Sequence, residues 1–514
     1  MPVRMEQDDP QGSKRNNSQG KRPSGGGGKS ILIYLVPMLF KLFKKKPKLT
    51  IGLIVIGIAF YFLGGKRLLT SFSSQAPSSF ATGFQPNLKK YDQAEVFEPL
   101  ADNRKNPLPE AYSLLDYCPK RLNQGKQGSC VGWASSYAAR SILYAKATGK
   151  DPDKIAFSPS YLYNQIALEG CQGAYLKDAM ASMYKQGVLP FDQFGYDENE
   201  CHDKPESHEQ QQASDFKIKG YNRLTKGGDK YDVDLLAIKQ NIAQGAPVII
   251  GMMVGGSFMQ QMEGKDIWTP TQRDYQQRGF GGHAMCVIGY DDYKNGGAFQ
   301  IMNSWGEKWG RKGVAYVSYK DFDIFVKEAY GLYPMGDASQ QQSSILKAKI
   351  ALLTNDTKEY IALGRKSVDV YTTTKELNSG TKFKMEVTNS NACYIYIFGQ
   401  ETDGSSYVLF PYTKKHSPYC GITGTRLFPK DYSMVLDSQG TKDYILVVLS
   451  SQPIDYVALN KKISLAEGNS YSQKLKAVIN NWEGTQSSGG KSLSIQTDMN
   501  KAALTAMVVE IKKK

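Results

Sequence analysis

The chain has 514 residues, a formal net charge of +15 and 41% hydrophobic residues, which allows about three packed domains. Residues 1–48 hold eleven Lys or Arg against three acids, so more than half of the excess charge lies in this tail. This distribution excludes the basic domain face expected of a nucleic-acid-binding protein and favours contact with an anionic membrane surface. Seven cysteines, none of them in a CxxC pair, exclude a disulfide scaffold and a zinc site of that type.

The N-terminal region is predicted to be a membrane anchor. Residues 1–48 form a basic, disordered tail, in which 31–43 is expected to be an interfacial helix rather than half of a helical hairpin. Residues 49–65 carry no charge and predict a single transmembrane helix. The basic run 44–48 predicts a cytoplasmic N-terminus and an exported remainder, either periplasmic or extracellular. A cleaved signal peptide is the rival interpretation, and the long leading region disfavours it.

The rest of the chain is predicted to hold a linker and two folded regions. Residues 66–106 are a polar linker, 107–335 an α+β unit, and 345–514 a β-sandwich of short strands separated by turn residues. In the α+β unit the predicted helices are 130–147, 175–186 and 234–244, the strands are 247–254, 284–290, 299–302 and 313–319, and 202–212 is a surface loop.

One cysteine stands where a nucleophile is expected. Cys130 follows Gly128 and Ser129 and opens the first predicted helix, whose N-terminus favours a thiolate and offers a backbone N–H to an oxyanion. Gln124 offers a second donor from its side chain. A single cysteine at a helix start is more often structural, so a base has to be found elsewhere in the chain.

Four histidines are candidates for that base. His202 and His208 lie in the polar insert and His416 in a lysine-rich stretch of the last domain, so we expect all three to be solvated. His283 instead begins an apolar strand after two glycines. Twenty residues later comes Asn303, an amide that can accept the imidazole N–H, beside Trp305, whose ring can shield that bond from water.

These residues lie in three stretches that resemble the motifs of papain-family cysteine peptidases. NQGKQGSCVGWA resembles the nucleophile motif, GGHAMCVIGYDD the histidine strand, and IMNSWGEKWGRKGVAYV the Asn-Ser-Trp-Gly segment. The resemblance spans about 107–335 and implies a helical lobe and a barrel-like lobe with a cleft between them. It implies that Cys130 and His283 form an ion pair, that Asn303 orients His283, and that Gln124 and the Cys130 amide form the oxyanion hole.

The resemblance also implies a substrate-binding surface, with some departures. Gly173, Ala174 and Gly282 are expected to line it, although the family has a second glycine in place of Ala174 and often Asp in place of Gly282. The family's usual cysteine is replaced by Gln127, so Cys171 lacks its expected partner.

Two disulfides are suggested by proximity along an exported chain, Cys171–Cys201 and Cys393–Cys420. Residues 66–106 are short for an inhibitory prosegment, so autoinhibition by a long propeptide is not expected. The C-terminal region, with Leu409-Phe410-Pro411, resembles a bacterial domain of unknown function, and its partner cannot be named.

We therefore expect a membrane-anchored cysteine peptidase that hydrolyses peptide bonds through a thioester, without a metal or other cofactor. Two alternatives are a catalytically inactive papain-like scaffold and a cell-wall peptide amidase or transpeptidase. Peptide or protein substrates and the membrane are the expected partners.

Overall fold

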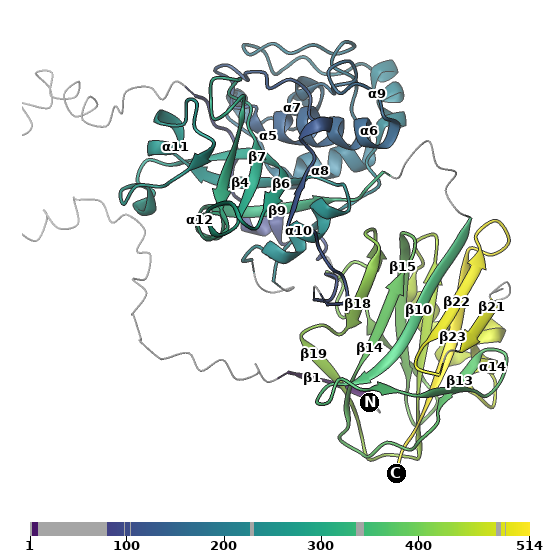
Figure 1. The fold of residues 1–514 in the computed structure, drawn as a ribbon. Helices are drawn as coiled ribbons and strands as arrows, with labels where there is room; N and C mark the ends of the chain where they lie inside the picture. Colours follow the sequence, from purple (N-terminus) through teal and green to yellow (C-terminus); the bar gives the residue numbers. More distant parts are fainter. Residues whose placement is uncertain are drawn as a thin grey trace, which may run out of the picture. The chain divides into compact units, whose positions relative to one another are not determined.

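The computed structural model describes residues 3–8, 80–96, 98–102, 104–226, 231–335, 344–479, 485–488 and 490–514 (Figure 1). The expected interfacial helix over 31–43 and transmembrane helix over 49–65 lie outside these residues. None of the helices in the described ranges combines the length and the hydropathy that a bilayer crossing needs.

The α+β unit begins with a helical part (Figure 1). Its long helix opens at Cys130 and runs without a break through α5 (Cys130–Gly132), the π-helical η3 (Trp133–Arg140) and α6 (Ser141–Thr148). Gly149 ends it with φ of 68°, a left-handed conformation that glycine adopts without strain. The other helices here are α7 (Pro159–Ile166), α8 (Leu176–Lys185) and α9 (Ser207–Ala213).

Helix α9 contradicts the predicted surface loop over 202–212. The polar composition of the insert suggested irregular structure, but Glu206 and Glu209 form a reciprocal capping box that starts a short helix. His202 and His208 nevertheless keep 76% and 66% of their side-chain surface exposed, as expected of solvated residues.

The second part of the unit is a sheet that is antiparallel except for the parallel pairing of β5 with β8. Its strand order is β3-β9-β4-β6-β7-β8-β5, with β2 (Ala111–Ser113) also paired to β6. The strands are β3 (Tyr221–Arg223), β4 (Val248–Val254), β5 (Ile267–Trp268), β6 (Gly281–Asp291), β7 (Ala298–Met302), β8 (Val314–Ser318) and β9 (Val326–Leu332). Helices α10 (Leu235–Ala243), α11 (Gly256–Gln260) and α12 (Tyr319–Phe325) accompany it.

The C-terminal region is a sandwich of two sheets, as its strand pattern predicts. One sheet has the order β1-β19-β14-β10-β22-β21, and the other β12-β13-β23-β20-β15-β16. Alternate residues of both sheets share one core, which includes Ile350, Phe383, Ile397 and Val447. The strands are β10 (Ile345–Thr354), β11 (Tyr360–Ile361), β12 (Leu363–Arg365), β13 (Val370–Thr373), β14 (Lys382–Asn389), β15 (Cys393–Gln400), β16 (Ser406–Phe410), β17 (Tyr419–Cys420), β18 (Gly424–Phe428), β19 (Tyr432–Leu436), β20 (Lys442–Ser450), β21 (Thr485–Ser488), β22 (Leu493–Asp498) and β23 (Leu504–Lys512).

Two features of this domain were not predicted. Helices α13 (Tyr456–Leu465) and α14 (Tyr471–Val478) cover the outer face of the second sheet, where Tyr396 and Val448 pack against Ile463 and Leu475. The expected disorder of the N-terminal tail, residues 1–48, is wrong for β1 (Val3–Gln7), which pairs antiparallel with β19.

The second expected disulfide is absent. Cys393 and Cys420 lie directly opposite each other on β15 and β17, yet both are free and buried. Opposed residues of an antiparallel pair have Cβ atoms about 4.5–5.5 Å apart, whereas a disulfide needs about 3.8 Å. Proximity along the chain therefore predicted the neighbourhood correctly but not the bond.

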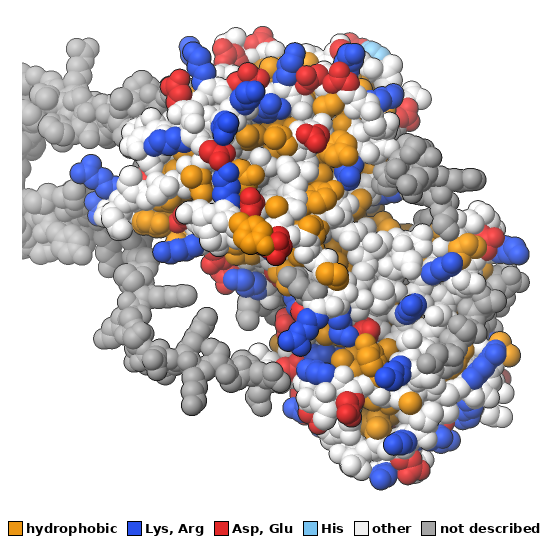
Figure 2. All heavy atoms as spheres, viewed as in Figure 1, with side chains coloured by type: hydrophobic (Ala, Val, Ile, Leu, Met, Phe, Trp, Pro, Cys, Tyr) orange, Lys and Arg blue, Asp and Glu red, His pale blue; other side chains and the backbone are white. Residues whose placement is uncertain are grey.

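Charged side chains of both signs are interspersed over the molecular face drawn in Figure 2.

Candidate active site

Cys130 occupies the first position of the long helix and is completely buried. Its Sγ accepts a hydrogen bond from the backbone N–H of Ala284 at 3.3 Å. Because Ala284 directly follows His283 on β6, this contact brings the thiol to the residue predicted to be its base, across 153 residues of chain.

His283 is held by two neighbours from the segment after β7. Its Nε2 lies 2.7 Å from Oδ1 of Asn303, so the amide oxygen accepts the N–H of that ring nitrogen. The ring of Trp305 stacks on the imidazole, with centroids 4.2 Å apart and an interplanar angle of 23°. Nδ1 is buried and has no hydrogen-bond partner in the described residues, which leaves this nitrogen available to take a proton from a thiol.

Gln124 is also buried and firmly oriented. Its Oε1 accepts a hydrogen bond from Oγ of Ser304 at 2.6 Å, and its Nε2 donates to the carbonyl of Gln127 at 2.9 Å. Because Oε1 of Gln124 accepts from Ser304, the orientation of the amide is fixed, and Nε2 is the end that donates. One of its two N–H groups remains for an oxyanion.

Burial makes the thiol and the imidazole neutral in this structure. It raises the pKa of Cys130 to about 12, although the N–H groups of Ala284 and Phe84 oppose the shift. It lowers the pKa of His283 to about 4, against the opposing hydrogen bond to Asn303. A dry site disfavours both charged forms, so the ion pair that the family resemblance implies is not favoured here.

The cause of this burial is the polar stretch before the α+β unit. Residues 80–87, which we call the crossing segment, run between Gly282 and Ala174 directly over Cys130. The N–H groups of Gly83 and Phe84 donate to the carbonyl of Gly282 at 3.1 and 3.0 Å. Ala174 donates to the Gly83 carbonyl at 2.9 Å and accepts from Gln85 at 3.1 Å. The predicted substrate surface is therefore occupied by the chain itself.

Glycines make this close passage of two backbones possible. A Cβ on Gly282 would lie 2.1 Å from the carbonyl oxygen of Phe84, and one on Gly173 would lie 2.1 Å from that of Gly83. Neither position has room for a side chain. The three residues predicted to line the substrate surface thus lie on both sides of the crossing segment, Gly173 and Ala174 on one side and Gly282 on the other. The Gly282 carbonyl accepts hydrogen bonds from the segment, whereas Ala174 both donates to it and accepts from it.

The side chains of the crossing segment find sites on both sides. The Phe84 ring is 1% exposed and packs against Gly251. A Cβ at position 251 would lie 2.3 Å from the ring, so the ring fits only because this residue is glycine. Phe80 stacks on Trp305 with centroids 4.7 Å apart, and the Trp305 Nε1–H donates to the carbonyl of Ala81 at 2.9 Å. The segment therefore also covers the tryptophan that shields His283.

The C-terminal end of the crossing segment is hydrogen-bonded to the buried carboxyl group of Glu328. The N–H of Asn87 donates to Oε1 of Glu328 at 3.1 Å, and the Asn87 side chain caps α4 (Leu88–Tyr91). Burial raises the pKa of Glu328 to about 7. Glu328 was not predicted as a site residue, because an acid on a strand of mixed polarity carries no local signal of burial.

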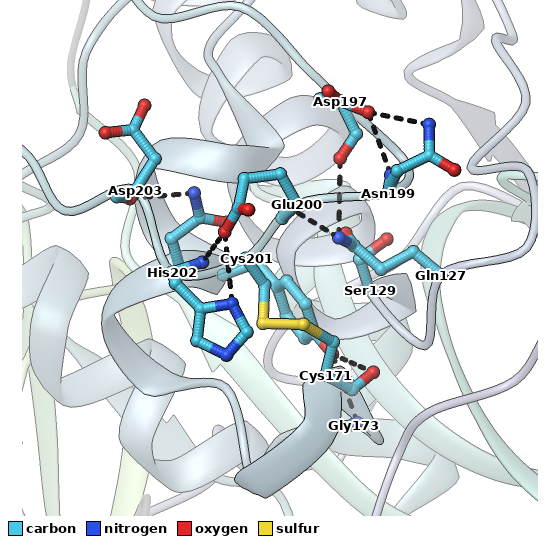
Figure 3. Close-up of a disulfide and its surroundings, with 12 residues drawn as sticks. Gln127, Ser129, Cys171, Gly173, Asp197, Asn199, Glu200, Cys201, His202 and Asp203 are labelled. Carbon is cyan, nitrogen blue, oxygen red and sulfur yellow. Dashed lines mark hydrogen bonds and ion pairs between the residues drawn. A yellow bond between two sulfur atoms is a disulfide. The ribbon is translucent and has the colours of Figure 1, made fainter.

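The predicted Cys171–Cys201 disulfide is present and lies beside the nucleophile loop (Figure 3). Gln127 stands where the family has a cysteine, and its Nε2 donates to the backbone carbonyls of Asp197 and Glu200 at 3.3 and 2.8 Å. The Gln127 side-chain amide thus links the loop before Cys130 to the loop that carries Cys201.

The other histidines take no part in this site. His202 and His208 are solvent-exposed beside glutamates, and His416 is half-buried in the C-terminal domain rather than fully exposed. Of the histidines, only His283 lies with Cys130, as predicted.

Comparison with known proteins agrees with these observations. Residues 116–329 match the papain family cysteine protease profile, and residues 376–453 match a domain of unknown function (DUF4384). A peptidase C1-like protein of Acanthamoeba polyphaga mimivirus is 32% identical over 235 residues, which cover 44% of this chain and 71% of that protein. Cathepsin K of Mus musculus is 27% identical over 241 residues, 45% of this chain and 66% of the cathepsin.

Among solved structures, xylellain, a cysteine protease from Xylella fastidiosa, aligns with 50% of this chain and 98% of its own, at 21% identity and a TM-score of 0.42. The viral relative, matched over most of its length, and the profile match over the domain that holds Cys130 and His283 show that the chain belongs to the papain family of cysteine proteases.

Proposed function

We propose that Cys130 is the nucleophile of a peptide-bond hydrolase and His283 its general base. The observation that carries this assignment is the pair of contacts around the imidazole. The N–H next to His283 bonds to the sulfur, while Asn303 occupies the opposite ring nitrogen and leaves Nδ1 for the thiol proton. Asn303 fixes the tautomer, and Trp305 keeps water from that hydrogen bond.

The reaction proceeds by acyl transfer. The Cys130 sulfur attacks the carbonyl carbon of the substrate after its proton passes to His283, and the oxyanion is met by the Gln124 side chain and the Cys130 N–H. The imidazolium then donates its proton to the departing amine, which leaves a thioester. Water, deprotonated by His283, hydrolyses the thioester and restores the thiol.

We assign the resting chain to a closed form, in which the crossing segment excludes substrate. The segment uses the same Gly282 carbonyl and Ala174 N–H that an extended peptide would need. The Phe84 N–H also contributes to the hydrogen bonding of the Cys130 sulfur, which places the segment against the thiol.

The decisive experiment uses a Phe84→Ala chain, to open the site, with and without Cys130→Ala. We expect the first protein to cleave a fluorogenic peptide library and to be labelled at Cys130 by an epoxide thiol reagent. The double variant should do neither. Cleavage that persists without Cys130 contradicts the assignment, and a site that is open but never labelled favours the inactive scaffold. Neither the scaffold nor the cell-wall alternative is favoured by the comparisons.

We further propose that residues 31–65 attach the protein to a membrane, on the strength of their apolar sequence and flanking lysines. The pairing of β1 with β19 requires residues 3–7 and the C-terminal domain to lie on the same side of that membrane. One crossing would place residues 3–7 and the C-terminal domain on opposite sides, whereas a hairpin or an interfacial helix leaves them together. Protease protection of an N-terminal tag in vesicles distinguishes these arrangements.

A further inference from the structure

The crossing segment continues directly into chain that is held by the C-terminal domain. Val96 donates its N–H to the carbonyl of Lys415 at 2.6 Å and accepts from the N–H of Ser417 at 3.1 Å. It forms a second bridge to Arg223 of β3, whose N–H donates to the carbonyl of Glu95 at 2.9 Å. Val96 is thus a short middle strand, with the α+β unit on one side and residues 412–417, the clamp loop, on the other.

A charge cluster reinforces this strand. The carboxylate of Asp92 receives the Lys415 ammonium at 2.7 Å and the Tyr231 hydroxyl at 2.8 Å, with the buried Arg223 at 3.4 Å. Hydrogen bonding from Lys415 is the main reason that the pKa of Asp92 lies below its usual range. Lys415 therefore holds the chain eight residues after Phe84 from the side of the C-terminal domain.

The next residues of the chain are held by the same domain. The Arg426 Nε–H donates to the carbonyl of Glu98 at 3.0 Å, and Ala101 donates to the carbonyl of Thr425 at 2.8 Å. Asn106 exchanges two hydrogen bonds with the backbone of Thr425. Contact with this domain thus extends from Asp92 to Asn106.

We propose that the C-terminal domain is an intramolecular clamp that keeps the crossing segment over Cys130. This regulation rests on the proposed function of the site. While the clamp loop holds Asp92 and Val96, the segment is tethered within a few residues of its binding surface, which gives it a high effective concentration there. When the clamp loop dissociates from Asp92 and Val96, Val96 keeps only its bridge to Arg223. The effective concentration of the crossing segment at its binding surface then falls. The domain of unknown function then acts as the control element of the peptidase.

The test measures how fast iodoacetamide modifies Cys130 in the full chain, with the modified cysteine identified by mass mapping. Lys415→Ala removes the ion pair but leaves the backbone contacts, and Val96→Pro removes the N–H that bonds to the clamp loop. Lys414→Ala, at the exposed neighbouring lysine, is the matched control. We expect modification to accelerate about two- to fivefold in Lys415→Ala, about tenfold in Val96→Pro, and not at all in Lys414→Ala.

Phe84→Ala separates the possible failures. If Phe84→Ala exposes Cys130 while Lys415→Ala and Val96→Pro react at the wild-type rate, the clamp is overturned and the proposed function stands. If Cys130 stays unreactive even in Phe84→Ala, both are overturned. Circular dichroism and thermal unfolding report whether each variant is folded. If Val96→Pro disturbs the fold, the proposal is decided by comparing the rates of Cys130 modification in Lys415→Ala and Lys414→Ala.

Discussion

Phe84→Ala gives the sharpest test of the closed form, because this ring is the fully buried one of the two phenylalanines in the crossing segment. It is 1% exposed and lies against Gly251. Full burial of a phenylalanine side chain stabilises a state by about 1.5–3 kcal/mol relative to exposure. Since 1.4 kcal/mol is a factor of ten, the open population should rise about ten- to a hundredfold. The rate of Cys130 alkylation by iodoacetamide at neutral pH should rise by the same factor.

The matched control is Leu88→Ala, four residues further along the chain. This leucine is 57% exposed, so its removal should change neither the closed population nor the alkylation rate. Thermal unfolding of both variants confirms that the fold is retained. An alkylation rate for Phe84→Ala within about twofold of wild type, in a folded protein, would refute the closed form as described.

Three further outcomes are expected. Asn303→Ala in an opened chain should lower kcat about ten- to a hundredfold, since the hydrogen bond to His283 worth about 1.5–3 kcal/mol is lost, while KM stays nearly constant in steady-state kinetics. Burial holds the pKa of His283 near 4 against 6.5 unfolded. Its contribution to stability, about 3 kcal/mol, is therefore complete above pH 6.5 and lost as the pH falls toward 4, and a His283→Gln chain should show a shallower decline of Tm over that range. Replacing Cys171 and Cys201 by serine should lower the free energy of unfolding by about 3–4 kcal/mol in denaturant titrations, because the bridge closes a loop with a sequence separation of 30 residues.

The grouping of the site residues could be predicted because it depends on residue types in a fixed order. A glycine-flanked cysteine at a helix start, a histidine opening an apolar strand and an Asn-Ser-Trp sequence each carry a local signal. The structure brings Cys130, His283 and Asn303 together as those signals indicated. The helices that begin at Cys130, Leu176 and Leu235 and the strands β4, β6, β7 and β8 followed from hydrophobic periodicity, whereas α7 and β9 were not predicted.

The crossing segment could not be predicted in the same way. The sequence FATGFQPN has neither a helical nor a strand period, and its composition is that of a linker. Its extended conformation is set by hydrogen bonds to Gly282 and Ala174, which are about 200 and 90 residues away in the sequence, respectively. The prediction that a long inhibitory propeptide is absent is not tested by this contact, since residues 80–87 alone pass between Gly282 and Ala174.

Strand β1 was missed for a related reason. A short charged stretch such as VRMEQ has too little apolar surface to fold alone, and it becomes a strand only by adding to the edge at β19. Val3 is nearly fully buried in the sandwich core, while its neighbours stay exposed. Edge pairing of this kind depends on a partner more than 400 residues away, which no local pattern reports.

The position of the clamp outside the site has a physical rationale. Under the proposed function, a substrate would use the same Gly282 carbonyl and Ala174 N–H as the crossing segment, so a change at these positions that loosens one would also loosen the other. Control of the closed population without loss of catalysis must therefore act on residues that substrate never touches. Asp92 and Val96 meet that condition, because they bind the clamp loop and β3 rather than Gly282 and Ala174. A regulator of this peptidase is accordingly expected to act on the C-terminal domain and to change the fraction of open molecules while leaving the KM of the open form unchanged.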